Sequence, residues 1–384
     1  MRRKTFKRLT ATLLALLMVV TVVTVGFPLT ASAAEAVTYT WYSWRSDGYL
    51  YSTVMTATDY TVVTSDLFKK NPRGLMSGTY VVKADTTIED YFYIRKNQNV
   101  KLIVQPDVTL TCKKGIGCGY DKDHEFATLS IFGTGKIVAT GKKYYAGIGG
   151  RDNESSGIII VHGTTIEATG GAYGAGIGGG DEGPSPDNRT YIMVLAGNIT
   201  AKGGKDAAGI GGGNEQAGAR TIIYGGNITA EGNTYGAGIG GGDEQGTKGI
   251  WIYGGNVTAK GGTYGAGIGV GDEGEDLGKA EDGGGINILG GNVTAKGGFR
   301  AAGIGGGCNR NIAGTIDIKG EDTVVYAIAG EEGAGIGSGS VGLWFGYGDM
   351  EATITIDCGK NSSINAYGID KEFMEQHPDN YINP

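Results

Sequence analysis

The chain has 384 residues, of which 74 are glycine and only 7 are proline. Glycine makes up about 7% of an average protein, and a collagen-like or disordered Pro/Gly-rich chain would contain far more proline. These numbers exclude both classes, and the 40% of hydrophobic residues is enough for a sizeable buried core.

The first 33 residues have the pattern of a secretory signal peptide. Five positive residues precede Leu9, an apolar run extends from Leu9 to Phe27, and Ala31-Ser32-Ala33 forms a small-residue cleavage site. We expect cleavage after Ala33 and a secreted, extracellular protein that can also associate with the cell surface. An uncleaved membrane anchor is the alternative, and no other segment is apolar enough to span a bilayer.

Removal of these residues changes the formal charge from −7 to −12. An acidic secreted protein repels nucleic acid and anionic membranes, so we expect neither as a partner. The charge suits neutral or cationic ligands, or calcium. The four cysteines, Cys112, Cys118, Cys308 and Cys358, show no metal-binding spacing. Export permits disulfides, and Cys112 and Cys118 are close enough in sequence to pair locally.

A repeat is the strongest signal in the sequence. The motif Ala-Gly-Ile-Gly recurs with isoleucines at Ile148, Ile177, Ile210, Ile239, Ile268, Ile304 and Ile336, and a degenerate copy at Ile116. A second motif, Gly-Asn-(Ile/Val)-Thr-Ala, places its Asn 12 residues before the next isoleucine in every copy, as with Asn256 and Ile268. Repeat length varies only after the glycine run, so one corner of each repeat accepts insertions.

Within a repeat the apolar residues alternate with period two, which indicates strands. In the copy from Ile250 to Ile268, three short alternating runs are separated by Gly254-Gly255 and Gly261-Gly262. Ordering a coil costs about 1–2 kcal/mol per residue in backbone entropy, so a single coil cannot fold without identical neighbours. The pattern predicts an all-β fold: a single-stranded, right-handed parallel β-helix of about nine or ten coils, stacked about 4.8 Å apart.

The sequence also resembles a known group of proteins. The segments Gly-Thr-Tyr-Val-Val (78–82), Val-Lys-Leu-Ile-Val-Gln-Pro-Asp-Val-Thr-Leu-Thr (100–111) and the Tyr-Gly-Ala-Gly-Ile-Gly-Gly-Gly copies are similar to glycine-rich β-helix repeat domains in surface proteins of Gram-positive, often gut-dwelling, bacteria. The resemblance covers about residues 75–365. It implies the β-helix fold and, loosely, carbohydrate binding at a cell surface.

We expect four regions along the chain: the signal peptide (1–33), an aromatic-rich N-terminal cap (34–75), the glycine-rich β-helix (76–365) and a C-terminal cap (366–384). The segment 34–75 contains Trp41 and Trp44 and little repeat character. We expect it to cover the unpaired edge of the first coil.

Four asparagines hold the same position in successive repeats: Asn198, Asn227, Asn256 and Asn292. They match glycosylation sequons, but their fixed repeat position favours a structural role. We expect an internal ladder in which each amide bonds to the corner of the next coil.

The strand that carries the Ala-Gly-Ile-Gly motif, which we call the glycine-rich strand, has glycine at every outward position. Two columns of outward side chains flank it. The tyrosines before it are Tyr144, Tyr173, Tyr235 and Tyr264, and the acids after it are Asp181, Glu182, Glu215, Asp243, Glu244, Asp272 and Glu273. We expect a shallow cleft with a glycine floor, a tyrosine wall and a carboxylate wall. Sugar rings would stack on the tyrosines, while their hydroxyls bond to the carboxylates.

The same acids raise two further interpretations. Calcium could bridge stacked carboxylates at Asp181, Asp243 and Asp272, although the nine-residue calcium-roll repeat is absent. A glycosidase needs two carboxylates about 5–9 Å apart, one with a raised pKa. Acids recur in every coil here, so no unique catalytic centre stands out. The irregular cluster from Asp121 to Glu125 reads as a solvated loop.

The first strand of each repeat is apolar on both sides, and such strands are normally covered on both faces. The outward positions are Ile160, Met193, Ile222 and Trp251 and, one step on, His162, Leu195, Tyr224, Tyr253 and Leu289. Either the N-terminal segment packs on this face, which we favour, or the face binds a protein partner.

The sequence therefore predicts a secreted or surface-associated, non-catalytic binding or adhesion module. The first expected ligand is a polysaccharide or other glycan, and the second is a host surface protein such as a mucin or immunoglobulin. The alternative function is a polysaccharide-degrading β-helix enzyme, either a lyase or a glycoside hydrolase. We expect no cofactor other than calcium.

Overall fold

The structure is a computed structural model that describes residues 35–45, 48–71, 73–274, 277, 284–309, 314–340 and 352–369. Contacts divide the chain into two units, Met1–Val37 and Thr38–Pro384. The predicted signal peptide and residues 370–384 of the predicted C-terminal cap lie outside the described residues.

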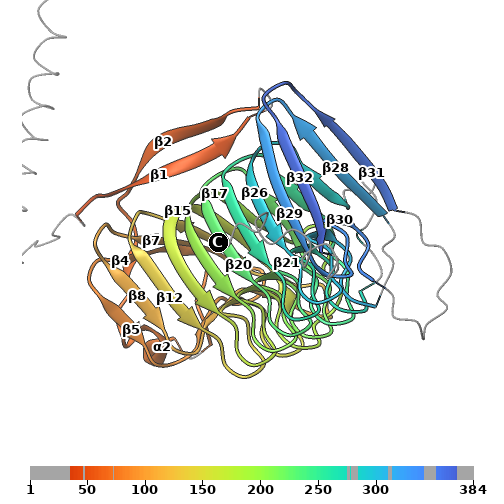
Figure 1. The fold of residues 1–384 in the computed structure, drawn as a ribbon. Helices are drawn as coiled ribbons and strands as arrows, with labels where there is room; N and C mark the ends of the chain where they lie inside the picture. The colour runs from red at the N-terminus through yellow and green to blue at the C-terminus, as the bar shows by residue number, and fades with distance from the viewer. Residues whose placement is uncertain are drawn as a thin grey trace, which may run out of the picture. The chain divides into compact units, whose positions relative to one another are not determined.

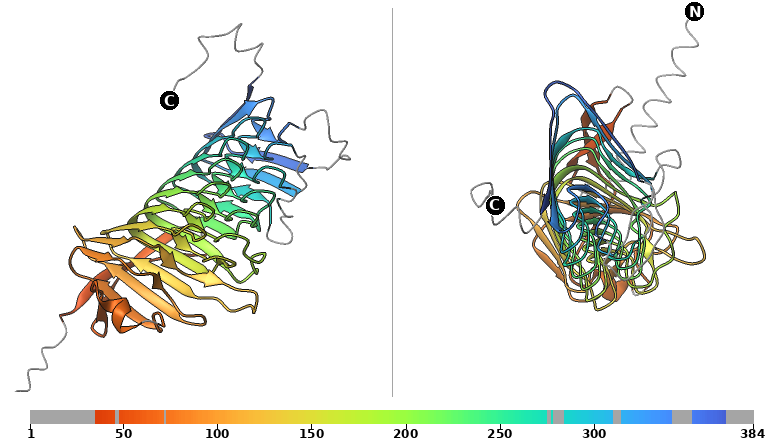
Figure 2. Two further views of the ribbon diagram at one scale, coloured as in Figure 1. Left: turned by 90° about the horizontal axis from the view of Figure 1, so that it is seen from below. Right: turned by 45° about the vertical axis from the view of Figure 1, so that its right-hand side comes forward.

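The described coils of the unit Thr38–Pro384 form a right-handed parallel β-helix, as the repeat predicts (Figures 1 and 2). Each coil has three faces joined by corners. The first face consists of β4 (Gly78–Val82), β7 (Asn99–Val104), β11 (Thr128–Phe132), the first part of β15 (Ile158–Thr169), the first part of β17 (Tyr191–Lys202), β19 (Arg220–Ile223), β22 (Ile250–Ile252), β25 (Ile286–Ile288), β28 (Gly314–Gly320) and β31 (Ala352–Cys358).

The second face follows a turn or bend in each coil. It consists of β5 (Thr86–Ile88), β8 (Thr109–Cys112), β12 (Lys136–Thr140), the later parts of β15 and β17, β20 (Asn227–Glu231), β23 (Asn256–Lys260), β26 (Gly291–Lys296), β29 (Thr323–Glu331) and β32 (Ser363–Ile369). Because β15 and β17 continue from the first face into the second, the two faces form one 19-stranded sheet. β32 extends to Ile369, so the last coil passes the predicted boundary at residue 365.

The third face is a nine-stranded sheet of two-residue strands. These are β6 (Phe92–Tyr93), β9 (Ile116–Gly117), β13 (Ile148–Gly149), β16 (Ile177–Gly178), β18 (Ile210–Gly211), β21 (Ile239–Gly240), β24 (Ile268–Gly269), β27 (Ile304–Gly305) and β30 (Ile336–Gly337). The isoleucine of each copy pairs with that of the next, for example Ile148 with Ile177. The constant spacing of 12 residues thus keeps the second and third faces in register.

The core fills the inside of the coils. On all three faces every second side chain points inward, so stacked Ile, Val and Ala columns form one continuous hydrophobic cluster. Ile148, Ile210 and Ile268 on the third face are fully buried. Burying each such side chain stabilises the fold by roughly 1.5–3 kcal/mol. Each coil gains this stabilisation only because the neighbouring coils cover its side chains.

The described residues between Thr61 and Leu75 close the first coil. β3 (Thr61–Val62) extends the first face by pairing with β4. The short helix α2 (Leu67–Lys70) buries Phe68 against Phe92 of the third face, with ring centroids 4.7 Å apart. This part of the cap covers the end of the core.

The rest of the predicted cap lies elsewhere. β1 (Val37–Trp44) and β2 (Leu50–Ala57) form a separate two-stranded sheet, which Figure 1 shows crossing the coils. We call the described residues 38–57 the N-terminal ribbon. Tyr39 contacts Phe132, whereas Trp44 contacts Tyr224 and Tyr253 several coils further on. Strand β1 therefore crosses successive coils along the side of the β-helix. The prediction of a single end cap is wrong for this segment.

Candidate functional site

The glycine-rich strand does not form an open floor, contrary to the sequence-based expectation. In each coil a backbone hydrogen bond closes a short loop around this strand. In one copy the Ala175 N–H donates to the Gly179 carbonyl at 2.9 Å. The outward glycines are buried. Gly178 has a φ of +147°, and a Cβ there would collide with the Gly211 carbonyl oxygen. Glycine serves tight coiling here rather than access for a ligand.

The expected tyrosine and carboxylate walls are neighbours, not opposite sides of a cleft. The Asp181 N–H donates to the Tyr144 carbonyl of the preceding coil at 2.9 Å, and Asp272 makes the same bond to Tyr235 at 2.8 Å. The backbone closure that buries the glycines brings the two columns together. The cleft between them is therefore a wrong prediction.

The tyrosine column itself exists. Tyr144 stacks on Tyr173 with ring centroids 5.8 Å apart, and Tyr235 stacks on Tyr264 at 5.4 Å. All four rings are half-buried. Because stacked rings cover each other's faces, the inner faces of each pair are closed to a ligand. Asp206 interrupts the column between Tyr173 and Tyr235.

The inner acids of the carboxylate column are largely buried, and their pKa values are raised. Burial, together with the neighbouring Glu273 and Asp243, raises the pKa of Asp272 to about 7. Burial and the charge of Asp206 raise that of Asp243 to about 6. Burial also raises the pKa of Asp181, although the Asn214 amide donates to its Oδ1 at 2.9 Å.

The outer acids of this column have a different environment. Glu182, Glu215 and Glu244 are exposed, and Glu273 is half-buried. All four adopt left-handed φ values between 48° and 56°. The side chains of these acids and of the inner aspartates lie at one corner of the helix, where they create a strongly acidic edge.

This edge offers no metal centre of the expected kind. Among the residues that the structure describes, no three His, Cys, Asp or Glu side chains come together in a way that could hold an ion. Asn214 separates Asp181 from Asp243 in the column. The proposed calcium ligands Asp181, Asp243 and Asp272 are therefore not brought together as one site.

A groove does lie close by, at the corner between the second and third faces. It encloses about 450 Å³ and crosses four successive coils, so it extends about 14 Å along the helix axis. We call it the glycine groove, and its lining consists of residues 232–234, 260–263, 296–299 and 329–331. The floor of the groove consists of the paired glycines of each copy, which the sequence pattern predicts only as turns.

The floor and walls of the glycine groove differ in character. Gly261-Gly262 and Gly297-Gly298 form a backbone floor, and a Cβ on Gly298 would collide with the Gly262 carbonyl oxygen. Lys260 and Lys296 end strands β23 and β26 on one side, and both are exposed. Neither forms an ion pair with any described residue, whereas Lys202 in the same column pairs with Glu231 at 3.1 Å.

An exposed aromatic ring stands at the other side of the groove. Phe299 is 40% exposed. The Tyr264 ring packs edge-on against it at 6.1 Å, and the Arg300 guanidinium lies 5.0 Å from its centroid. Arg300 is held in turn by Glu332 at 2.7 Å. The Phe299 ring is thus fixed in place while part of it remains open to solvent.

Two more exposed aromatic side chains lie near the C-terminal end of the second face. Tyr326 is 42% exposed and Tyr367 is 52% exposed. Tyr326 pairs with Thr294 of β26, and Tyr367 pairs with Ile328 of β29, directly before the groove residue Ala329. Neither tyrosine belongs to the repeat pattern, because they replace the Thr and Lys residues of the regular repeat.

The asparagine ladder exists but lies outside the core. The Nδ2 groups of Asn227, Asn256 and Asn292 donate to the Oδ1 of the preceding asparagine at 2.8, 2.9 and 3.0 Å, and Asn198 accepts the first of these bonds. All four side chains are exposed on the second face. The expectation of an internal ladder that bonds to corners is wrong, because these positions alternate with the inward Ile and Val residues.

The apolar side of the first face is covered by the N-terminal ribbon, which is the interpretation that the sequence favoured. Trp44 stacks on Tyr224 at 4.5 Å, and Trp41 lies 5.0 Å from His162. Leu195, between these contacts, is 3% exposed.

The remaining outward residues of this face are also not fully open. Ile160, Met193, Ile222 and Trp251 are half-buried, as are Tyr224 and Tyr253. The residues predicted as an alternative protein-binding face do not form a fully exposed apolar patch.

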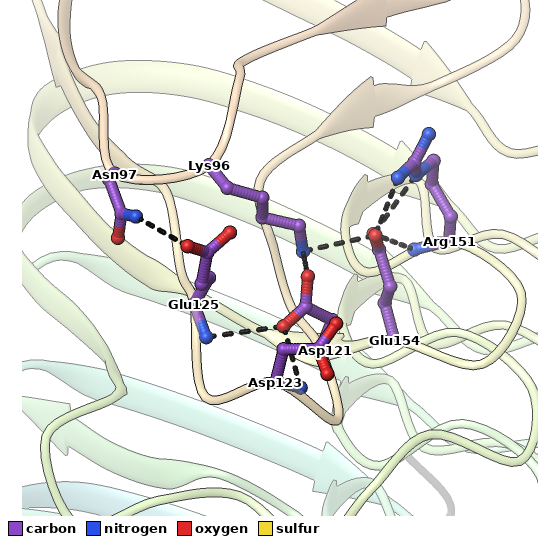
Figure 3. A network of polar contacts seen from close by, with 7 residues as sticks. All are labelled: Lys96, Asn97, Asp121, Asp123, Glu125, Arg151 and Glu154. Carbon is purple, nitrogen blue, oxygen red and sulfur yellow. Dashed lines mark hydrogen bonds and ion pairs between the residues drawn. The ribbon is translucent and has the colours of Figure 1, made fainter.

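The irregular loop from Asp121 to Glu125 is anchored to an ion-pair network around the buried Glu154 (Figure 3). Lys96 Nζ lies 3.0 Å from a Glu154 carboxylate oxygen and 3.8 Å from Asp121, and Arg151 contacts Glu154 at 2.6 Å. Burial alone would raise the pKa of Glu154, but the hydrogen bonds and charges of Arg151 and Lys96 lower it overall. Lys96 and Arg151 balance the charges of Glu154 and Asp121, and this pairing supports a structural role.

The four cysteines are free thiols, so Cys112 and Cys118 do not form the local disulfide that their spacing allowed. Burial raises the pKa of Cys118 and Cys308 to about 12, and that of Cys112 further still. Thiols with such pKa values are poor nucleophiles at neutral pH.

Within the described residues, no helix has the length and apolar character needed to cross a membrane. Six segments match the family model described as the beta helix repeat, and these are residues 159–181, 196–214, 222–243, 250–270, 286–308 and 316–340. No curated protein and no solved structure matches the chain. The family match supports a parallel β-helix repeat domain from residue 159 to residue 340.

Proposed function

We propose that this protein is a secreted, non-catalytic binding module for an acidic polysaccharide, which it holds in the glycine groove. The observation that carries the proposal is the groove itself, with its backbone floor, one fixed and exposed aromatic ring and two lysines without acidic partners among the described residues. The site lies one corner away from the cleft that the sequence suggested.

The shape of the groove supports an extended ligand. Because equivalent residues recur every coil, a polymer lying along the groove meets a similar glycine floor at each step of about 4.8 Å. Phe299 offers an apolar surface for the C–H face of a sugar ring. Tyr326, in the same strand as the groove residues 329–331, and Tyr367, one coil further on, add exposed rings. Bare backbone at the floor lets a sugar chain approach closely.

The local charge supports an acidic ligand. Lys260 and Lys296 line the groove, and Glu331 is the one acid among its lining residues. A carboxylate or sulfate group on the polysaccharide would pair with these ammonium groups, each such exposed contact contributing about 1 kcal/mol or less. This local preference differs from the one suggested by the net charge of the whole chain.

The test is binding of the purified protein to acidic and neutral polysaccharides, measured by calorimetry. The expected result is measurable affinity for a polyuronate or sulfated glycan and weaker affinity for a neutral glucan. Phe299→Ala should weaken binding about tenfold, and Lys260→Gln with Lys296→Gln should weaken it and reduce its salt dependence. The matched control is Lys202→Gln, because Lys202 has the same place in its coil but lies outside the groove.

Two outcomes would contradict the proposal. The first is equal affinity for acidic and neutral chains that none of these variants changes. The second is an equal loss for the Lys202 control and the groove lysines, which would indicate general charge attraction rather than a site.

One observation favours the enzyme alternative, namely the raised pKa values of Asp243 and Asp272. A carboxyl group that keeps its proton near neutral pH is what a general acid requires. Incubation with the same polysaccharides, followed by measurement of new reducing ends or unsaturated products, tests it. Activity that is lost in Asp243→Asn or Asp272→Asn would replace the binding-module proposal with a degrading enzyme.

A further inference from the structure

The outward column of side chains that borders the glycine groove changes its chemistry from coil to coil. Its members stand in register on the second face, and we call them the groove column. In order along the helix axis they are Lys202, Glu231, Lys260, Lys296, Ile328 and Tyr367. Successive members are one coil step of about 4.8 Å apart. A polymer in the groove therefore meets a different side chain at each step.

The groove column contains one stretch of uncompensated positive charge. Lys202 pairs with Glu231 at 3.1 Å, so these two residues carry no net charge. Lys260 and Lys296 are neighbours on stacked strands, and neither forms an ion pair with a described residue. Two like charges side by side repel each other, and an anion bound between them removes that repulsion. The two lysines together therefore form one anion subsite.

Beyond the lysines the groove column becomes apolar. Ile328 follows Lys296, and Tyr367 follows Ile328. Tyr326 points to the same side of β29 as Ile328, because the residue between them, Ala327, is buried. Two residues along a strand span about 7 Å, and adjacent strands lie about 4.8 Å apart. Tyr326, Ile328 and Tyr367 thus form an apolar platform that is about as large as one sugar ring.

The coil that carries this platform also carries an acid. Glu331 lines the groove three residues after Ile328, and its side chain is exposed. A carboxylate or sulfate group bound beside Glu331 would be repelled, whereas a neutral sugar would not. The C–H face of a neutral sugar can pack on the platform. This end of the groove therefore favours an uncharged sugar residue.

We infer that, among acidic polysaccharides, the groove selects chains in which acidic and neutral sugar residues alternate. This inference rests on the proposed function. The acidic residue binds between Lys260 and Lys296, and the next residue, which is neutral, packs on the apolar platform. The neutral residue on the other side lies beside Glu231, whose charge Lys202 already compensates. A chain with an acid on every residue would place one of its charges beside Glu331.

The test compares two hexasaccharides by calorimetry at one fixed salt concentration. In a hyaluronan hexasaccharide uronate and neutral sugars alternate, whereas in an oligogalacturonate of the same length every residue is a uronate. We expect the hyaluronan hexasaccharide to bind about fivefold more tightly, although it carries fewer charges, because one of its neutral residues contacts the platform. General attraction to the lysines would give the opposite order.

Two variants should change this preference. Glu331→Gln should raise the affinity for oligogalacturonate about threefold and leave that for hyaluronan nearly unchanged. Ile328→Lys should abolish the preference, because it extends the lysine pair and removes the centre of the platform. Glu182→Gln is the matched control for Glu331→Gln, since it removes the same charge from an exposed acid outside the groove. This control should leave the ratio of the two affinities unchanged.

The outcomes distinguish this inference from the proposed function. Equal or tighter binding of oligogalacturonate by the unmodified protein would overturn the inference and leave the groove as a site for acidic chains. The same holds if Glu331→Gln and Glu182→Gln change the ratio of affinities equally. Failure of both hexasaccharides to bind would contradict the proposed function itself.

Discussion

His162 should act as an acid-sensitive contact between the N-terminal ribbon and the β-helix. Its imidazole stacks on Phe132 at 4.3 Å and lies 5.0 Å from Trp41, and its Nδ1 accepts the Tyr42 N–H at 3.2 Å. Burial lowers the pKa of His162 to about 4. The charged imidazole would also lose its role as acceptor for Tyr42.

The direction and size of the pH effect on the unfolding free energy follow from the linkage between protonation and folding. The folded state favours the neutral imidazole, so His162 makes its full contribution to the unfolding free energy above its unfolded pKa of about 6.5. It is lost progressively as the pH falls from about 6.5 to about 4. A shift of about 2.5 pKa units at 1.36 kcal/mol each limits the effect to about 3 kcal/mol.

The assay compares urea unfolding of the protein and of His162→Phe at pH 7.5, 5.5 and 4. Phenylalanine keeps the ring stack with Phe132 but does not titrate. Because the carboxyl groups titrate equally in both proteins, the difference between their unfolding free energies isolates His162. We expect this difference to shift by about 3 kcal/mol in favour of the variant between pH 7.5 and pH 4. A difference that does not change with pH, or an NMR titration of His162 near 6.5, would contradict a lowered pKa for His162 in the folded state.

Three other predictions concern the coils. Asn256→Ala removes two ladder bonds and should lower the unfolding free energy by about 1–2 kcal/mol, roughly twice the loss in Asn198→Ala, which removes one; equal losses in denaturant unfolding would contradict this. Gly178→Ala should cost at least about 2 kcal/mol because of its positive φ and its collision with Gly211, and an unchanged melting temperature would exclude that strain. Asp272→Asn should stabilise the protein by up to about 4 kcal/mol at pH 8, because the folded state raises the pKa of Asp272 to about 7 and so disfavours its charged form. This gain should vanish toward pH 4, where Asp272 is protonated, and a gain that is constant with pH would contradict the assignment.

The architecture could be predicted because the repeat encodes register. A constant interval between Asn256 and Ile268 in every copy requires that equivalent residues stack, and the pairing of Ile239 with Ile268 confirms it. Alternation with period two assigned the inward side chains correctly. These signals are local and repeat many times, so small irregularities do not obscure them.

The site could not be predicted as well, because an outward position is not always an exposed one. The outward glycines near Gly178 are buried by a backbone closure that leaves no trace in side-chain alternation. Tyr224 is outward but covered by Trp44, more than 150 residues away in the chain. The groove between Lys260 and Phe299 forms where consecutive turns stack, and a pattern within one repeat does not reveal such a concave surface.

The most direct test of the central claim is a crystal structure of the protein in complex with a short acidic oligosaccharide. We expect sugar density along the glycine groove, with one ring against Phe299 and a carboxylate or sulfate group near Lys260 or Lys296. Density on another face, or an empty groove under conditions in which calorimetry shows binding, would contradict it.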